Sequence, residues 1–170
     1  MKIRKAVFAD VKGIAKVHVD SWRTTYRDII SDEFLNKLSY ESREKLWVSN
    51  MSNMNVFVAE TDEGDIVGFS TGGKERSGNY TGTDGELYAI YILKEYQGQG
   101  LGKLLVKPVI VELLSLNINS MLVLVLEKNN SCHFYEALGG KRLDVIEVEI
   151  AGDKLNEIVY GWTDIRAIQL

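Results

Sequence analysis

Hydrophobic positions recur along this chain at two spacings, which predict a mixture of helices and strands. Residues 2–8 alternate between polar and apolar side chains, as in a strand with one buried face. Apolar residues across 11–22 recur at helical spacing, which predicts an amphipathic helix, and Asp10 stands where its N-cap is expected. Further on, residues 31–33 open a short helix, and Ser39 could cap another helix.

Strand signals return in the middle of the chain. Residues 56–60 and 66–70 are rich in aliphatic and aromatic side chains, and the acidic segment 62–65 between them has the composition of a hairpin turn. Residues 72–85 contain many Gly, Ser and Asn residues, which predicts a surface loop or the broken end of a strand. The next segment, 87–92, is again aliphatic and aromatic and predicts a strand.

The second half of the chain alternates helix and strand in the same way. A helical pattern spans about 101–116, but Pro108 lies within it, so a kink or a restart of the helix is expected there. The continuous apolar run 121–126 is typical of a strand buried on both faces. Ser131 or Asn130 caps a short helix after it. A final hairpin is predicted from two strands: 141–150 and 155–162.

The overall composition is that of a globular protein. The chain has 170 residues, of which 45% are hydrophobic and 26% charged, and this fits a single domain spanning 1–170. Its one cysteine, Cys132, cannot form an internal disulfide, and its two histidines, His18 and His133, do not lie in a metal-ligand motif. We therefore expect no metal site and a reducing, cytoplasmic location.

Two kinds of partner are disfavoured by the sequence. The N-terminal segment lacks the apolar region of a signal peptide, and the longest apolar run, 121–126, is too short to cross a bilayer. The net charge is −4 and no basic block stands out, which argues against nucleic-acid binding. We expect neither a membrane nor a nucleic acid as partner.

Three glycines, Gly98, Gly100 and Gly102, lie between the strand at 87–92 and the helix that follows. In a strand–turn–helix arrangement, the unpaired N–H groups of the first helical turn point at one spot. The positive end of the helix dipole makes that spot attractive to anions, above all phosphate. A tight turn without a ligand would use the same residues, so the glycines alone leave both interpretations open.

The spacing of these residues excludes two familiar phosphate loops. A Walker A loop ending at Gly102-Lys103 would need Gly at 97 and Ser or Thr at 104, where the chain has Gln97 and Leu104. The dinucleotide motif starting at Gly98 would need Gly at position 103, where the chain has Lys. A nucleotide-phosphate enzyme is therefore disfavoured.

The pattern that remains is Q/R-x-x-G-x-G/A, carried by Gln97-Gly98-Gln99-Gly100-Leu101-Gly102. It resembles the acyl-coenzyme A pyrophosphate loop of the GNAT superfamily of N-acetyltransferases. A second segment, 129–139, reads N-N-S-C-H-F-Y-E-A-L-G and resembles the family's N-x-S-x-x-F-Y-E-x-L-G. Both motifs lie at predicted strand-to-helix junctions and in the family's order, so the resemblance is far more specific than three glycines.

The resemblance covers almost the whole chain and implies an α/β (α+β) fold. In the GNAT fold a mixed, mostly antiparallel central sheet is flanked by helices. Two parallel strands, here 86–93 and 120–127, splay apart and leave a cleft for the cofactor, acetyl-CoA. The implied activity is transfer of the acetyl group of acetyl-CoA to a primary amine, by direct attack in a ternary complex.

This reaction needs a base. An amine attacks a thioester only when neutral, yet a lysine-like amine has a pKa of about 10.4. In lysine-acetylating family members, a glutamate eleven residues before the loop glutamine removes the proton, and this position is Glu86 here. Glu86 could also be a carboxylate held by solvent or by a salt bridge. Glu127 is the second candidate, although its distance from Asn129 does not match the family's pattern.

The resemblance also implies how the cofactor is held. Backbone N–H groups of Ile90, Tyr91 and Ile92 are expected to bind the thioester and pantetheine carbonyls, and those of the glycine loop to bind the pyrophosphate. Asn129 is expected to bind the pantetheine arm, and Ser131 to join it through water. The full expected set is Ile90, Tyr91, Ile92, Gln97, Gly98, Gln99, Gly100, Leu101, Gly102, Lys103, Asn129 and Ser131.

Three further side chains are candidates for proton transfer, phosphate binding or nucleophilic attack. Tyr135 is the expected acid that protonates the departing thiolate. Lys103 either adds charge near the phosphates or is simply solvated. Cys132 could suggest an acyl-enzyme, but no His/Asp partner is apparent and a small buried thiol is the commoner case. We therefore expect direct transfer.

The acceptor stays open at this stage. It is a small-molecule or peptide amine, and Trp22, Arg23, Tyr26 and Arg27 are candidates to line its pocket. A catalytically silent acyl-CoA-binding or sensing module of the same fold is the alternative function, which the presence of both Glu86 and Tyr135 disfavours. A homodimer is possible through an exposed edge strand such as the C-terminal one.

Overall fold

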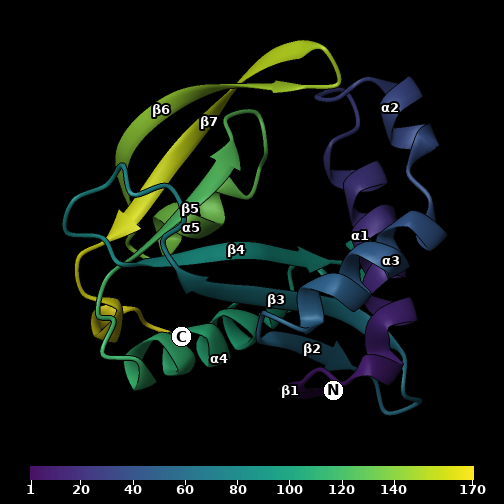
Figure 1. Cartoon of the computed structure of the whole chain (residues 1–170), viewed down its shortest axis with the longest axis horizontal. Coiled ribbons are helices and arrows are strands. Elements are labelled where there is room, and N and C mark those ends of the chain that lie inside the picture. The colour runs from purple at the N-terminus through teal and green to yellow at the C-terminus, as the bar shows by residue number, and fades with distance from the viewer.

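A computed structural model describes all residues from 1 to 170. Seven strands form one sheet in the order β1-β2-β3-β4-β5-β7-β6, in which only β4 and β5 run parallel (Figure 1). The strands are β1 Lys2–Lys5, β2 Val56–Glu60, β3 Ile66–Lys74, β4 Gly85–Ile92, β5 Met121–Leu126, β6 Lys141–Ile150 and β7 Asp153–Trp162. The helices are α1 Val11–Thr25, α2 Asp32–Lys37, α3 Tyr40–Met51, α4 Leu101–Ser115 and α5 Cys132–Ala137. The expected mixed, mostly antiparallel sheet is confirmed.

Helices cover both faces of the sheet (Figure 1). On one face, α4 packs on β2, β3 and β4, and α5 packs with the apolar side chains of β5 and β7. On the other face, α1 packs on β3 and β4, and α3 packs on α1 and contacts Phe69 of β3 through Trp47. Side chains from the tip of the β6–β7 hairpin pack against the α1–α2 segment. Each strand therefore has a face turned to α4 and α5 and a face turned to α1, which decides where its polar side chains lie.

The two parallel strands separate soon after they begin. Only two residue pairs join β4 to β5, Gly85 with Met121 and Glu86 with Leu122. Beyond them the ribbons of β4 and β5 diverge, as Figure 1 shows. The pairing of β3 with β4 shifts by one residue at Thr71 and leaves Tyr88 without a partner. Such a bulge bends its strand and increases its twist, so the predicted splay between the strands is confirmed and has a local cause.

Two stretches are more regular than the sequence suggests. Strand β3 continues through Gly72 and Gly73 to Lys74, so the loop is confined to 75–84. Gly72 lies there because a Cβ would come within 2.5 Å of Val109 and 2.7 Å of the Glu86 carbonyl oxygen. The glycine thus permits a close approach of β3, β4 and α4. The pairing of β3 with β4 also shifts at this point, which agrees with the predicted alternative of a broken strand end.

Helix α4 runs without interruption through Pro108, so the expected restart is absent. Proline removes only one hydrogen bond, the one that the Leu104 carbonyl would accept. The next carbonyl, that of Leu105, accepts a 2.7 Å hydrogen bond from the buried Ser70 hydroxyl on β3. This contact and the buried residues on either side of the proline hold the helix on the sheet.

Two predicted helix caps lie at the expected helix starts, but their side chains do not accept a hydrogen bond from the helix. The Asp10 side chain accepts no bond from α1; it accepts from the Val7 N–H and binds Arg4 at 2.7 Å. At α5 neither Ser131 nor Asn130 caps; instead Asn129 Oδ1 accepts from the Ser131 N–H at 2.9 Å. In both cases a carboxylate or amide two to three residues from an N–H closes a local turn instead. The caps at Ser31 and Ser39 are confirmed.

Two further features bear on expected partners. None of the helices is long and apolar enough to cross a membrane. The C-terminal strand β7 lies between β5 and β6, so the exposed edges of the sheet are β1 and β6. The expectation that the C-terminal strand forms an edge is wrong, because the β6–β7 hairpin folds back and places its second strand inside.

Candidate active site

The glycine turn presents an uninterrupted row of backbone donors. Between Gly98 and Lys103, six consecutive N–H groups donate to no protein acceptor, and the first bond in this stretch is from Leu104 N–H to Gly100 at 3.4 Å. Gly98 and Gly100 have φ of +73° and +80°, and a Cβ at either would meet open space. The turn therefore faces outward with its amides exposed at the N-terminus of α4, where the dipole favours an anion.

The two glutamines of the turn secure its shape. Gln97 Nε2 donates to the Ile92 carbonyl at 2.9 Å, and Gln99 Nε2 donates to the Glu95 carbonyl at 3.0 Å. Both side chains thus bind backbone at the end of β4 and leave the amides of the turn unobstructed. Lys103 is exposed, and its Nζ donates to the Gln169 carbonyl at 3.2 Å.

The two sequence motifs meet at Gly102. A Cβ at this position would lie 3.0 Å from Cε2 of Phe134, which is tighter than an ordinary contact. Gly102 therefore lets the first turn of α4 pack directly on α5. This contact fixes the segment from Asn129 to Tyr135 relative to the glycine turn.

The edge of β4 that faces the gap carries unpaired backbone. No residue of β4 after Glu86 pairs with β5. The side chains of Ile90 and Ile92 belong to the face of β4 that turns toward α4, whereas Tyr91 belongs to the α1 face. Because N–H groups alternate in direction along a strand, Ile90 to Ile92 cannot all present their amides to the gap at once.

Asn129 and Ser131 lie where β5 ends. Asn129 is 8% exposed, and its Oδ1 is used by the Ser131 N–H, whereas its Nδ2 donates to no protein atom. The Ser131 hydroxyl likewise makes no hydrogen bond within the protein and is partly exposed. Both side chains therefore retain polar groups for a ligand.

Tyr135 is buried with its hydroxyl unpaired. The residue is 5% exposed and packs against Phe134, Tyr160 and Trp162. Its hydroxyl makes no hydrogen bond with the protein, and that oxygen is not sealed from solvent. Burial raises the pKa of Tyr135, and the nearby Tyr91 hydroxyl and Cys132 thiol add to the effect. The hydroxyl thus stays protonated at neutral pH and is able to donate.

Glu86 is buried and held by Arg76. The carboxylate is 4% exposed, and Arg76 reaches Oε1 with Nη2 at 2.6 Å and Nε at 3.2 Å. The Arg76 backbone N–H donates to Oε2 at 3.1 Å. The Arg76 guanidinium also lies 4.1 Å from the centre of the Tyr88 ring. A base at Glu86 would have to give up part of this pairing when it takes a proton.

The other candidates for chemistry lie outside the gap. Glu127 follows β5 and is exposed, with Arg142 at 3.4 Å and Asn156 at 3.2 Å from its carboxylate. Cys132 is 8% exposed, and burial raises the pKa of its thiol above the ordinary value. The expected small buried thiol is therefore confirmed. No cluster of His, Cys, Asp and Glu able to hold a metal ion is found.

An aromatic wall on α1 faces β4. His18 stacks on Tyr91 with ring centres 5.4 Å apart, and Trp22 contacts Tyr26 edge to face at 4.8 Å. Trp47 donates from Nε1 to Nδ1 of His18 at 3.0 Å. Burial lowers the pKa of His18 to about 4, so the ring is neutral. The Trp22 indole N–H is sealed from solvent and has no acceptor.

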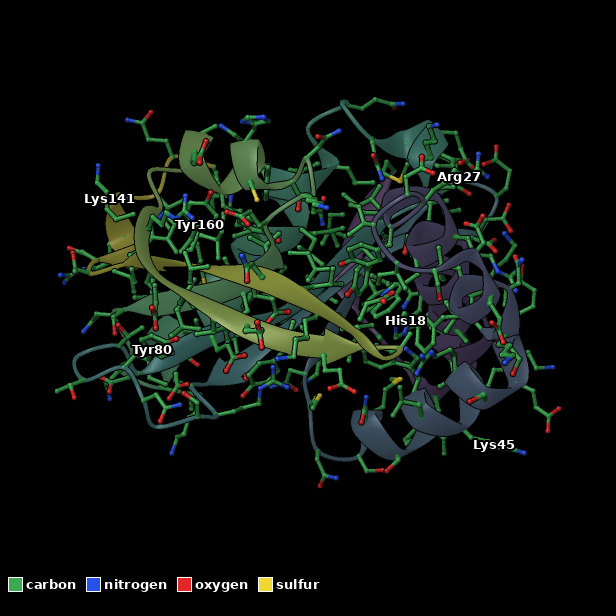
Figure 2. All side chains as sticks on the ribbon, turned by 90° about the horizontal axis from the view of Figure 1, so that it is seen from above. His18, Arg27, Lys45, Tyr80, Lys141 and Tyr160 are labelled. Atoms are coloured by element: carbon green, nitrogen blue, oxygen red, sulfur yellow. The ribbon has the colours of Figure 1, made fainter.

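The four residues expected to line an acceptor pocket separate into two groups. Trp22 and Tyr26 belong to the aromatic wall. Arg23 instead donates to the carbonyls of Leu35 and Leu38, which ties α1 to α2. Arg27 is exposed and points away from the body of the protein (Figure 2). The structure thus brings only the aromatic pair toward the gap.

Two residues near the gap were missed by the sequence analysis. Arg76 lies in a stretch predicted only as a loop or strand end, and nothing in the sequence pairs it with Glu86. Glu157 lies on β7, directly beside Leu126 of β5. The alternation of β7 was a usable signal, because Glu157 is a charged residue that adjoins the buried run 158–162.

The loop between β3 and β4 reaches across to the hairpin. Tyr80 donates from its hydroxyl to Asp144 Oδ2 of β6 at 3.2 Å. In Figure 2 the β6–β7 ribbon runs between His18 at one end and Tyr80 and Tyr160 toward the other. The α1 face of β4, β5 and β7 is therefore bordered by the aromatic wall on one side and by this loop on the other.

Comparison with known proteins identifies the class to which this architecture belongs. A family model described as "Acetyltransferase (GNAT) family" matches residues 18–140. The chain is 46% identical over 167 residues to the "Uncharacterized N-acetyltransferase YuaI" of Bacillus subtilis (strain 168), and the match covers 98% of this chain and 95% of that protein. The chain therefore belongs to the GNAT family of acetyltransferases, and it is an acyltransferase.

Solved structures share the fold. PaiA N-acetyltransferase from Thermoplasma acidophilum, in complex with coenzyme A, superimposes with a TM-score of 0.69 at 24% identity over 92% of this chain and 96% of that chain. YncA from Salmonella typhimurium, with its cofactor acetyl-CoA, gives a TM-score of 0.70 at 22% identity over 97% and 94%. At these identities the likeness establishes a common fold.

Proposed function

We propose that this protein transfers the acetyl group of acetyl-CoA to a primary amine. The observation that carries the proposal is the row of six unpaired N–H groups from Gly98 to Lys103 at the start of α4. A row of aligned backbone donors without a partner suits a pyrophosphate, since helix N-termini of this kind favour anions. Gly98 and Gly100 leave open space in front of the turn.

The rest of the binding surface suits a long thioester tail. The unpaired edge of β4 beyond Glu86 offers main-chain groups to the thioester and pantetheine. The free amide of Asn129 and the hydroxyl of Ser131 extend this polar track at the end of β5. When bound, acetyl-CoA supplies an activated carbonyl carbon and a good leaving group.

Two side chains take the proposed proton-transfer roles. Glu86 is the candidate carboxylate near the acceptor amine, and Tyr135 is the acid that donates its hydroxyl proton to the leaving sulfur. The Tyr135 hydroxyl supports its role, because the ring is buried while the hydroxyl is not sealed from solvent and no protein acceptor engages it. The acceptor is a small-molecule or peptide amine.

Calorimetry tests the proposal directly. Titration of the folded protein with coenzyme A should give saturable heat at micromolar to millimolar concentrations, and ATP should give none. Absence of heat with coenzyme A, or a preference for ATP, would refute the proposal. A screen of primary amines with acetyl-CoA, read by thiol release, then tests turnover.

A catalytically silent acyl-CoA-binding module is the second candidate function. It is favoured by the pairing of Glu86 with Arg76, which engages both carboxylate oxygens. This candidate predicts coenzyme A binding without thiol release for any amine. Arg76→Ala would separate the two functions, because release of Glu86 from its partner should change turnover only in an active enzyme.

A further inference from the structure

Glu157 lies on the face of the sheet that looks into the gap. On β7, Ile158, Tyr160 and Trp162 belong to the core beneath α4 and α5. Successive side chains of a strand alternate between faces, so Glu157 points to the opposite face. Its neighbour on β5 is Leu126, whose side chain packs with the α1–α2 residues.

Glu86 shares that face. It pairs with Leu122 on β5, and Leu122, Leu124 and Leu126 follow each other on one face of the strand. The charge of Glu86 adds to burial in raising the pKa of Glu157, as expected of two carboxylates on the same face. Two carboxylates, on β4 and on β7, therefore lie on the same face of the sheet on either side of β5.

The two carboxylates differ in their partners. Glu86 accepts three hydrogen bonds from Arg76. Glu157 is partly buried and makes no hydrogen bond or salt bridge with any residue of the chain. A partly buried carboxylate without a donor is unusual, and a cationic ligand would supply the missing donor.

Other polar groups in this part of the protein also lack a hydrogen-bond partner. Its charge contributes to the raised pKa of Tyr26, Tyr80 and Tyr91, which places it among the aromatic wall and the β3–β4 loop. The wall contains the sealed and unpaired indole N–H of Trp22. Tyr135, whose hydroxyl is unpaired, packs on the other face of the sheet and is near enough to Tyr91 for that residue to raise its pKa.

We propose that Glu157, in place of Glu86, whose carboxylate is engaged by Arg76, receives the acceptor amine, binding its ammonium group and taking its proton. This rests on the proposed acetyl transfer. The ammonium gives one proton to the Glu157 carboxylate, and the neutral nitrogen then forms a bond to the thioester carbonyl carbon. The C–S bond breaks, its electron pair leaves on sulfur, and the second nitrogen proton replaces the one that Tyr135 donates to sulfur. Glu157 returns its proton to solvent.

The same geometry defines the class of acceptor. Two carboxylates and a set of aromatic rings face the opening, and Arg76 is already paired with Glu86. An ammonium group on an apolar or aromatic body fits this surface. An amine with a carboxylate or phosphate beside the nitrogen is repelled by Glu157 and Glu86.

Nuclear magnetic resonance of the carboxyl carbons tests binding without turnover. Protein labelled with 13C at glutamate Cδ and saturated with coenzyme A is titrated with n-butylammonium chloride. The resonance that is missing in Glu157→Gln should shift, and the resonance missing in Glu149→Gln should not, since Glu149 is exposed on β6. Tetramethylammonium, which has charge but no N–H, is the ligand control. An unmoved Glu157 resonance, or equal shifts at both positions, overturns the proposal.

Kinetics with n-butylamine supply the second readout. Glu157→Gln should lower kcat/KM for the amine at pH 7 by about 10²- to 10⁴-fold, with an unchanged Kd for coenzyme A. The deficit should shrink toward pH 10, where the free amine becomes common. The groups that face Glu157 do not reverse this trend: Glu86 is paired with Arg76, and Tyr26, Tyr80 and Tyr91 have raised pKa values.

The outcomes separate this inference from the proposed function. If coenzyme A does not bind, acetyl transfer itself is refuted. If coenzyme A binds but Glu157→Gln stays within about 3-fold of Glu149→Gln at every pH, the role of Glu157 is refuted and acetyl transfer stands. A loss of coenzyme A affinity in Glu157→Gln would also refute the role, because it would show damage to the fold.

Discussion

At the scale of single residues, the candidate site is marked by polar groups that have no hydrogen-bond partner in the protein. The amides of the glycine turn, the Tyr135 hydroxyl and the Glu157 carboxylate are polar groups without protein partners. A folded protein leaves few such groups unsatisfied, because each costs about 1–3 kcal/mol when it is buried. The Tyr135 and Glu157 oxygens are not sealed from solvent, so they remain available to a ligand and support the proposed binding site.

Tyr135→Phe should slow acetyl transfer by about 10²- to 10⁴-fold, because the acid for the leaving sulfur is removed. The Kd for coenzyme A, measured by calorimetry, should not change. Tyr160→Phe is the matched control: this neighbouring buried ring donates to Glu136 at 2.7 Å and has no proposed role in transfer. Equal rates for the two variants would remove Tyr135 from the mechanism.

Gly100→Ala should weaken coenzyme A binding at least tenfold. Gly100 has φ of +80°, so alanine there is strained by about 1–2 kcal/mol, and its Cβ stands among the outward amides. Gly152→Ala controls for the strain, since Gly152 has φ of +84° and also faces open space but lies in the β6–β7 turn. Both variants should unfold at similar denaturant concentrations. An equal effect on coenzyme A affinity would contradict the assignment of the turn.

At the scale of elements, the sequence predicted type and order well and contacts poorly. Periodicity located every strand and helix, and two motifs located the glycine turn and α5. Glycine content misled at Gly72 and Gly73, because the same residue serves loops and close strand–helix contacts. Glu86 was found from a motif, but its partner Arg76 and the second carboxylate, Glu157, depend on how β3, β4 and β7 fold together. No local pattern records such pairings.

The contact of α1 with α3 should make stability depend on pH. The pKa of His18 is lowered to about 4 by burial, against 6.5 for an unfolded histidine. The unfolded chain therefore binds more protons between these values, and stability is present above pH 6.5 and lost as pH falls toward 4. The loss should reach up to about 3 kcal/mol.

Urea unfolding between pH 4 and 7 measures this effect. His18→Gln should reduce the slope of stability against pH in that range. His133→Gln should leave the slope unchanged, because the His133 side chain is 85% exposed. A slope that survives in His18→Gln would assign the pH dependence to other groups.

At the scale of the whole molecule, the opening is built by parts distant in sequence. The tip of the β6–β7 hairpin packs on the α1–α2 segment, and the β3–β4 loop reaches β6 through Tyr80 (Figure 1). The opening thus depends on a hairpin that is held at both ends. A homodimer stays a prediction, and the strands available for it are the edges β1 and β6.

Leu155→Ala should lower stability by about 1–3 kcal/mol, since its side chain packs with the α1–α2 cluster. It should also raise KM for the amine more than KM for acetyl-CoA, because the hairpin positions Glu157. Val145→Ala on the same hairpin is the control, with its side chain 40% exposed and outside that cluster. Thermal unfolding and steady-state kinetics measure both effects. A larger change in KM for acetyl-CoA would contradict this arrangement.

The extra residue at Tyr88 makes the site vulnerable to a change that spares every functional side chain. Deleting that one amino acid would let β4 pair with β3 without a shift, because Leu87 and Ala89 already pair with the adjacent residues Gly72 and Thr71. Every functional side chain would keep its face, but the bend and added twist of the bulge would be lost, and the fissure between β4 and β5 would narrow. In relatives of this protein, a one-codon deletion here should therefore accompany loss of catalysis even where glutamate, tyrosine and glycines all persist.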